Sequence, residues 1–232
     1  MVFSSPVFLF VFLPAILLCY FFGRKSFRNW ILVLFSLLFY AFGEPKKILL
    51  MLLSILVNYA AGLLMEKYPR RKKLFLVLSV VYNLGMLFIF KYLNFAADTV
   101  CRILGKASPL HEIVMPIGIS FYTFQILSYV IDVYRGKCRA QHDLLSMALY
   151  VSLFPQLIAG PIVRYTDIEK QIREREHSVN RAADGMLRFA IGFSKKILFA
   201  DQLAPLVNTA FSGSHASLLV NWVGMIAYAR QI

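Results

Sequence analysis

The sequence has few cysteines, and their number and spacing exclude two kinds of stabilised fold. Its three cysteines, Cys19, Cys101 and Cys138, are an odd number without metal-ligand spacing, so neither a disulfide framework nor a cysteine-based metal centre is expected. We expect all three to be buried, unpaired thiols in or beside apolar runs. The sequence also lacks a G-x-S-x-G nucleophile elbow, a phosphate-binding loop and a cluster of metal ligands. No standard catalytic or metal-binding motif is therefore present.

Acidic residues are also scarce, with 12 Asp and Glu against 25 Lys and Arg, which gives a formal net charge of +13. Such a balance first suggests a nucleic acid as partner. The basic residues, however, stand in short runs between hydrophobic stretches, as in cytoplasmic loops that face anionic lipid. We therefore expect this charge to face a lipid bilayer and expect no nucleic acid as partner.

Apolar residues make up most of the chain. The hydrophobic fraction is 59% and the mean hydropathy is +0.66, whereas soluble domains are about 45–50% apolar. The apolar runs cover residues 2–22, 30–43, 47–65, 74–95, 113–134, 144–163, 184–200 and 218–232. They predict an all-α, multi-pass transmembrane protein. Because no repeat or linker separates the runs, we expect a single membrane domain over 1–232.

The lengths of the runs predict which of them cross the membrane. Residues 47–65, 74–95 and 113–134 are expected to be clean spans of a hydrocarbon core about 30 Å thick. Residues 30–43 are short for a straight span and predict a tilted or partial helix. Residues 2–22 lack a basic n-region and a cleavage site, so they predict a retained anchor and not a signal peptide.

Three basic clusters predict the orientation of the chain. They lie at residues 24–28, 67–73 and 135–139, and two apolar runs separate each cluster from the next. The positive-inside rule places all three clusters in the cytoplasm. We therefore expect a multi-pass protein of the cell (inner) membrane with its N-terminus outside.

The run 144–163 departs from this regular pattern. Pro155, Gly160 and Pro161 interrupt it, and a charge-dense stretch follows. It predicts a broken or re-entrant helix that does not cross completely, and such backbone is tolerated only where protein or a cavity surrounds it. Arg164 directly follows the break. Its guanidinium can either hold an anionic group of a substrate or contact a lipid headgroup, and both interpretations remain open.

A stripe of polar residues runs along one face of the helix expected over 113–134. Its members lie at spacings of four, three, four and three: Gly118, Tyr122, Gln125, Tyr129 and Asp132. Such a stripe faces protein or water and not lipid. It is either interhelical packing or a cavity wall formed by Tyr122, Gln125 and Tyr129, and both readings stay open. Asp132 is expected to pair with Arg135. A second polar line, Ser54, Asn58 and Gly62, is expected to serve helix packing.

The run 184–200 carries basic residues on one helix face. Arg188 and Lys195 are seven residues apart, and Lys196 is adjacent. Either this is an amphipathic helix that lies on anionic lipid, or Lys195 and Lys196 attract a phosphate-bearing acyl donor from the cytoplasm. The chain's histidines all lie outside the apolar runs and are expected at the surface: His111, His142, His177 and His215. We therefore expect no catalytic residue within 1–232.

Three ordered strings carry a family resemblance. MPIGISFYTFQILSYVIDVYRG, YVSLFPQLIAGPIVRYTDI and RFAIGFSKKILFADQLAP resemble successive blocks of the alginate O-acetyltransferase branch of the membrane-bound O-acyltransferases, and the opening residues are similar to the same branch. The resemblance implies a multi-pass helical fold with a tunnel. It implies transfer of an acetyl group from a cytoplasmic donor, acetyl-CoA or another thioester, to an exported polysaccharide such as alginate. No tightly bound cofactor is implied, and a partner acetyltransferase is expected on the outer side.

The family's essential histidine lies in a later helix, and no position of this sequence matches it. The resemblance therefore predicts that residues 1–232 are an N-terminal half, truncated before the catalytic-histidine region and inactive alone. Two other functions stay open from the residues themselves. One is a polytopic transporter or channel-like protein whose broken helix lines a path, and the other is a noncatalytic scaffold for a partner enzyme. A later histidine-bearing helix favours the acyltransferase, whereas an inverted repeat favours the transporter.

Overall fold

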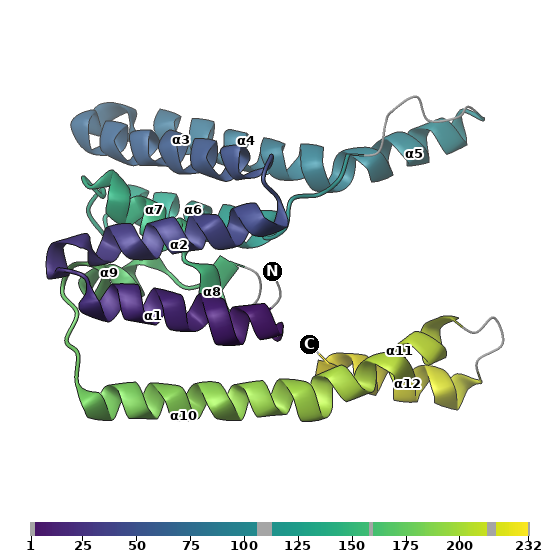
Figure 1. The fold of residues 1–232 in the computed structure, drawn as a ribbon. Helices are drawn as coiled ribbons and strands as arrows, with labels where there is room; N and C mark the ends of the chain where they lie inside the picture. The colour runs from purple at the N-terminus through teal and green to yellow at the C-terminus, as the bar shows by residue number, and fades with distance from the viewer. Residues whose placement is uncertain (1–2, 106–112, 158–159, 213–216, 232) are drawn as a thin grey trace. The chain divides into compact units, whose positions relative to one another are not determined.

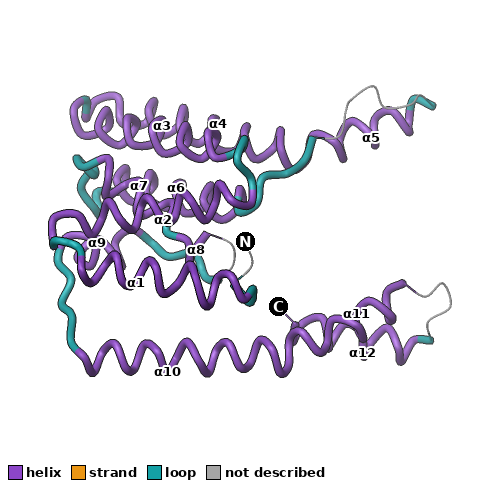
Figure 2. The backbone as a smooth tube through the Cα atoms, viewed as in Figure 1, coloured by secondary structure: helices purple, strands orange, loops and turns teal. Residues whose placement is uncertain are grey.

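The computed structural model describes residues 3–105, 113–157, 160–212 and 217–231. All regular structure in these residues is helical, as the apolar runs predicted (Figure 2). The helices form two compact units, unit 1 (Val7–Arg175) and unit 2 (Val2–Pro6 with Glu176–Ile232). Each unit is described by itself, and the single domain expected over 1–232 stays a prediction.

Unit 1 contains nine α-helices among the described residues, together with short π-helical and 3₁₀ turns at their ends. The α-helices are α1 (Leu13–Phe22), α2 (Arg28–Gly43), α3 (Ile48–Lys67), α4 (Lys72–Leu87), α5 (Leu93–Ile103), α6 (Ile119–Tyr134), α7 (Leu144–Ser152), α8 (Phe154–Leu157) and α9 (Tyr165–Arg173). The π-helical turns are η1 (Phe8–Phe12) and η4 (Phe88–Tyr92), and the 3₁₀ turns are η2 (Lys25–Phe27) and η3 (Pro69–Arg71).

Three helical segments are long and apolar enough to cross a membrane. They are Lys25–Gly43, Ile48–Lys67 and Pro69–Ile103, with 19, 20 and 35 residues. Of the tilted or partial helix expected over 30–43, the partial helix was wrong, because the helical segment already begins at Lys25 in the preceding basic cluster, whereas the tilt stays a prediction. The clean span expected over 113–134 was also too long. Pro116 precedes a left-handed Gly118 (φ 75°), so α6 begins only at Ile119.

A closed polar network joins α3 to α4 in the interior of unit 1. Asn58 accepts hydrogen bonds at Oδ1 from Ser79 Oγ (2.6 Å) and Asn83 Nδ2 (2.7 Å). Asn58 Nδ2 also donates to the Ser54 carbonyl (2.7 Å), and Asn83 Nδ2 to the Ser79 carbonyl (2.8 Å). All four side chains are buried. The expectation that the line of Ser54 and Asn58 serves helix packing is confirmed.

Aromatic rings pack the opening of the chain against α2 and α8. The rings of Phe8 and Phe12 lie 5.5–6.0 Å, centroid to centroid, from those of Phe39 and Phe154. These edge-to-face and tilted contacts bury apolar area that a single helix cannot cover. They hold the short α8 at the interior of unit 1.

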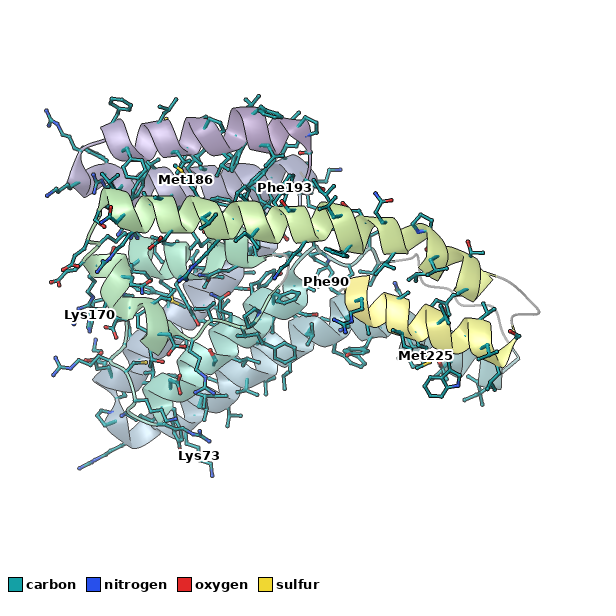
Figure 3. The ribbon with its side chains drawn as sticks, turned by 90° about the horizontal axis from the view of Figure 1, so that it is seen from below. Lys73, Phe90, Lys170, Met186, Phe193 and Met225 are labelled. Atoms are coloured by element: carbon teal, nitrogen blue, oxygen red, sulfur yellow. The ribbon has the colours of Figure 1, made fainter. Side chains whose placement is uncertain are left out.

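The basic clusters of unit 1 gather at one end, which we call the basic end. The α1–α2, α3–α4 and α6–α7 connections all lie there (Figure 1). In Figure 3, Lys73 and Lys170 lie towards this end and Phe90 towards the other. At the basic end the Asn29 side chain donates to the Ile172 carbonyl (3.3 Å). The arrangement agrees with one cytoplasmic side for all three clusters, while the orientation itself stays a prediction.

Unit 2 consists of α10 (Val179–Lys195), the π-helical turn η5 (Lys196–Ala200), α11 (Asp201–Ser212) and α12 (Leu218–Gln231), with residues 3–6. α11 and α12 pack closely, because a Cβ at Gly224 would lie 2.6 Å from the Ala210 Cβ. α10 is amphipathic, and Figure 3 labels Met186 and Phe193, seven residues apart along it. The amphipathic helix expected in 184–200 is therefore present.

The three cysteines are free, but they are not buried as expected. Cys19 is exposed and Cys101 and Cys138 are half-buried. In α1 the buried positions are Ile16 and Tyr20, and Cys19 stands about 100° around the helix from its neighbour Tyr20. An apolar sequence context alone does not show which face of a helix packs inward.

Candidate functional site

The polar stripe of α6 faces the protein interior. Its four polar residues are all buried, and none has more than 6% of its surface exposed: Tyr122, Gln125, Tyr129 and Asp132. The left-handed Gly118 precedes them and packs tightly, because a Cβ there would lie 2.5 Å from the Leu157 carbonyl oxygen. The periodicity thus placed the stripe correctly against protein and not lipid.

Gln125 ties α6 to the broken segment that follows α7. Its Nε2 donates to the Tyr150 carbonyl (2.7 Å) and to Gln156 Oε1 (3.3 Å). The Tyr150 hydroxyl lies 3.1 Å from both the Gln125 and Val163 carbonyl oxygens. Backbone carbonyls near the break in 144–163 therefore find side-chain partners, as non-helical backbone at membrane depth requires.

Tyr129 anchors the α6–α7 connection. Its hydroxyl accepts from the Gln141 backbone N–H (2.9 Å), and Gln141 Nε2 donates to the Tyr165 hydroxyl (2.6 Å). The Tyr165 ring lies edge-on to the Tyr129 and Tyr150 rings at 5.2 and 5.3 Å. Gln141 and Tyr165 were not predicted as partners of the stripe, because they come from the α6–α7 connection and from α9, outside its periodic spacing.

Some buried hydroxyls of unit 1 have no hydrogen-bond partner among the described residues. They belong to Tyr40, Tyr122, Thr123 and Ser152. Tyr122 lies in the first turn of α6, and just before this helix the Ile117 backbone N–H donates to Glu44 Oε2 (2.9 Å). Buried hydroxyls usually have a partner, so unpartnered ones indicate places where water or a substrate group can bind. The role of Tyr122, Gln125 and Tyr129 as a cavity wall stays a prediction.

The break expected in 144–163 is present. α7 ends at Ser152, Leu153 is non-helical (φ −54°, ψ 113°), and α8 is one short turn. Arg164 precedes α9 with an exposed side chain and forms no ion pair with a described residue. Its guanidinium is therefore available to an anion, and the choice between substrate and lipid headgroup stays open.

Lys195 and Lys196 belong to unit 2, whereas the α6 stripe and Arg164 belong to unit 1. Lys196 Nζ pairs with Asp201 at 2.8 and 3.1 Å and donates to Ser4 Oγ at 3.3 Å. The pairing of Asp201 with a lysine links η5 to the start of α11. Since its charge is partly balanced within the unit, Lys196 is a weaker candidate for a phosphate than Lys195.

Two other expectations concern charged side chains. Asp132 and Arg135 do not form the expected ion pair, because Asp132 faces the interior of unit 1 while Arg135 is exposed at the end of α6. His142 is exposed as expected and lies 3.0 Å from Glu66 Oε2. His111 and His215 lie outside the described residues.

The α6–α7 connection also holds Cys138. Burial, and then the nearby charges of Asp132 and Glu169, raise the pKa of its thiol to about 11. The thiol is therefore neutral and a poor nucleophile near pH 7. No group of three or more potential metal ligands occurs among the residues that the structure describes.

Comparison with known proteins identifies the family. The family model described as MBOAT, membrane-bound O-acyltransferase family, matches residues 48–229. The chain belongs to this family. The match includes the α6 stripe, the broken helix and most of unit 2, so the ordered strings of the sequence are confirmed as family features. The chain is thus a multi-pass membrane protein of the acyltransferase class and not of the transporter class.

Curated relatives match the whole chain. It is 41% identical to the probable alginate O-acetylase AlgI of Pseudomonas aeruginosa and 39% identical to that of Azotobacter vinelandii. Both matches cover 100% of this chain, but only 46% of the first protein and 48% of the second. It is 30% identical to a peptidoglycan O-acetyltransferase of Helicobacter pylori, of which it covers 51%. The chain therefore spans about half the length of the curated relatives it matches. No solved structure matches it.

Proposed function

We propose that this chain serves an O-acyltransferase that acetylates an exported polysaccharide, with an alginate-like polymer as acceptor. The observation that carries the proposal is the similarity of the entire chain to several alginate O-acetylases, the first at 41% identity. The peptidoglycan O-acetyltransferase at 30% identity makes peptidoglycan the second candidate acceptor. Both acceptors are exported polymers with free hydroxyl groups, so they require the same chemistry.

Transfer to a hydroxyl requires a base that takes the proton as the oxygen attacks the acyl carbon. His142 does not fit this role, because it is exposed and beside Glu66. We propose that a histidine outside residues 1–232 supplies the base and that the donor is acetyl-CoA or another thioester. In this proposal Arg164 of unit 1, and separately Lys195 and Lys196 of unit 2, are the candidates that attract the donor's phosphates at the cytoplasmic side. A partner acetyltransferase on the outer side receives or shares the acyl group.

The proposal is tested by complementation. A Pseudomonas aeruginosa strain that lacks its alginate O-acetylase receives the reading frame that contains residues 1–232, and the acetyl content of its secreted alginate is measured by NMR. We expect acetylation to return. If alginate remains unacetylated although the protein is present in the membrane, an alginate acceptor is wrong, and acetylated muramic acid in the same cells would then point to peptidoglycan.

Residues 1–232 expressed alone test the need for an external base. We expect no acetyl transfer, because base catalysis contributes roughly 10²–10⁴-fold. We also expect little folded protein. A monodisperse preparation of residues 1–232 that acetylates alginate would contradict the assignment of the base to another segment.

The proposed orientation, with the N-terminus outside, is tested by cysteine labelling in intact cells. Single cysteines near Arg71 and Lys137 should be shielded from a membrane-impermeant thiol reagent, whereas one near Lys106 should react. The native Cys19, Cys101 and Cys138 are replaced first. Labelling near Arg71 from outside would overturn the orientation.

A further inference from the structure

The basic end of unit 1 brings two arginines to one aromatic ring. The guanidinium carbon of Arg28, at the start of α2, lies 5.2 Å from the centroid of the Tyr20 ring, and that of Arg175 lies 6.0 Å from it. Arg175 Nη1 also lies 3.5 Å from the Tyr20 hydroxyl. Tyr20 itself is buried in α1. Arg175, 155 positions after Tyr20 in the sequence, thus joins Arg28 beside the same ring.

Neither guanidinium is neutralised by a carboxylate of the described residues. Neighbouring arginines do find such partners, since Arg173 pairs with Glu169 at 3.3 Å within α9. Glu174, next to Arg175 in the sequence, forms no ion pair with it. Arg175 Nε donates instead to the Gln171 carbonyl (2.8 Å), so the positive charge of Arg175, like that of Arg28, is not balanced by an ion pair with a described residue. Both guanidinium carbons lie within 6.0 Å of the same ring centroid, so an anion bound near that ring is attracted by two positive charges.

The start of α2 adds positive potential at the same place. Phe27 precedes the helix without a side-chain cap, and the first turn contains no acidic residue. The Arg28 backbone N–H itself donates to the Lys25 carbonyl, but the dipole of the 16-residue helix adds a partial positive charge near Arg28 and favours an anion there. Arg24 and Lys25, both exposed, lie one turn before.

Among the described residues, Arg28 is held by packing and not by a side-chain hydrogen bond. Its Nε is enclosed and has no acceptor among the described residues, while the residue as a whole is only half-buried. The Tyr20 ring thus orients the guanidinium through a cation–π contact and leaves its outer nitrogen atoms for a ligand. The geometry suits the bidentate binding that arginine offers to phosphate oxygens.

We propose that Arg28, Arg175 and the start of α2, braced by Tyr20, form a binding site for a phosphate group at the basic end of unit 1. An anionic phospholipid headgroup and a soluble phosphorylated donor offer the same group. Trp30 and Phe27, both exposed beside the site, fit the interface of a membrane, where lipid phosphates lie. The site is separate from the α6 stripe, and its test measures binding and not acyl transfer.

The test uses the full protein purified in detergent, with two probes. Dioctanoyl phosphatidylglycerol represents the lipid source and coenzyme A the soluble source, and affinity is measured by native mass spectrometry. We expect Arg28→Gln and Arg175→Gln each to weaken binding of at least one probe roughly five-fold, which corresponds to about 1 kcal/mol per basic side chain. Lys73→Gln is the matched control, because it removes an exposed charge at the same end.

Each outcome decides the proposal or the source of the phosphate. A selective loss for phosphatidylglycerol assigns the site to lipid, and a selective loss for coenzyme A assigns it to the soluble donor. Equal losses in Lys73→Gln would reduce the effect to general surface charge and overturn the site, as would wild-type binding in both glutamine variants. If Arg28→Gln does not fold, the binding measurements on Arg28→Lys and Arg175→Gln test the site instead. The lysine variant keeps the charge but loses the planar fork, so its affinity should be intermediate.

Discussion

The α3–α4 pair and the α6–α7 pair both bury polar side chains, but they use them differently. Between α3 and α4 the two asparagines and two serines bond to one another and to backbone carbonyls within the pair. Between α6 and α7 the bonds of Gln125 and Tyr129 reach the broken segment and the α6–α7 connection. Close to them, the hydroxyls of Tyr122 and Thr123 lack partners within the described chain. The first network is closed, and the second is open.

The difference separates packing from a candidate site. All bonds of the closed network lie within the α3–α4 pair. Their loss should therefore lower the stability of the fold without changing catalysis. An open network holds irregular backbone in place and leaves donors unpaired, which is how sites within membrane proteins are built. Four substitutions test this comparison, and we give them from the largest expected effect to the smallest.

Gly118→Ala should have the largest effect, because it acts on the start of α6 in the open network. A side chain in the left-handed region costs about 1–2 kcal/mol. In addition, its Cβ would lie 2.5 Å from the Leu157 carbonyl oxygen, a backbone atom that cannot move aside easily. We expect a large loss of folded protein by fluorescence-detected size exclusion. Gly136→Ala is the control, since its φ is 72° but no atom lies within 4 Å, and an equal loss there would assign the effect to backbone strain alone.

Asn58→Leu should destabilise the closed network without changing catalysis. It leaves Ser79 and Asn83 without their buried acceptor, and stranding buried partners costs about 1–3 kcal/mol. We expect a lower Tm and an unchanged acetylation rate per folded molecule. The double variant Asn58→Leu with Asn83→Leu should cost less than the sum of the single ones, because fewer groups remain unpaired. An additive result would mean that the two asparagines do not act as one network.

Gln125→Leu should affect both properties. Interhelical hydrogen bonds in membrane proteins contribute roughly 0.6–2 kcal/mol, so a moderate fall in Tm is expected. If the stripe is a cavity wall, acetylation must fall by more than the loss of folded protein explains. A fall in folded protein alone would show that Gln125 only packs, and the open network would then resemble the closed one.

Tyr122→Phe should have the smallest effect on stability. Its hydroxyl has no described partner, so removing it should change the free energy of unfolding by less than about 0.5 kcal/mol. Acetylation should nevertheless fall if this hydroxyl meets a substrate or an ordered water. Unchanged acetylation in a stable Tyr122→Phe variant would remove Tyr122 from the site.

Periodicity and composition were sufficient to predict the helical class, the α6 stripe and the packing role of Ser54 and Asn58. They depend only on local spacing, which a single sequence displays. The partners of the stripe were not predictable, because Gln141, Gln156 and Tyr165 come from connections and short helices whose positions depend on the tertiary fold. The Tyr20, Arg28 and Arg175 cluster was not predictable for the same reason, since Arg175 lies far from the other two residues in the sequence.

Two predictions of helix boundaries failed because local backbone features determine where a helix begins. The helix expected over 113–134 lost its first turns to Pro116 and the left-handed Gly118, and the helix expected over 30–43 gained turns from the charged residues before it. Hydropathy counts apolar residues, but helices begin where the backbone allows. The inward turn of Asp132 likewise separated it from Arg135, which spacing alone had paired.

The 35-residue helix Pro69–Ile103 is longer than the membrane it crosses. At 1.5 Å per residue it measures about 52 Å, whereas the hydrocarbon core is about 30 Å thick and observed tilts reach about 40°. Even at a tilt of about 40° the segment extends roughly 40 Å along the membrane normal, so about 10 Å of it lies beyond the hydrocarbon core. The amphipathic α5, with Asn94, Asp98 and Arg102, is the end suited to water. This helix lies at the end of unit 1 opposite the basic end (Figure 1), so the segment presents a polar helical surface beyond the hydrocarbon core on that side.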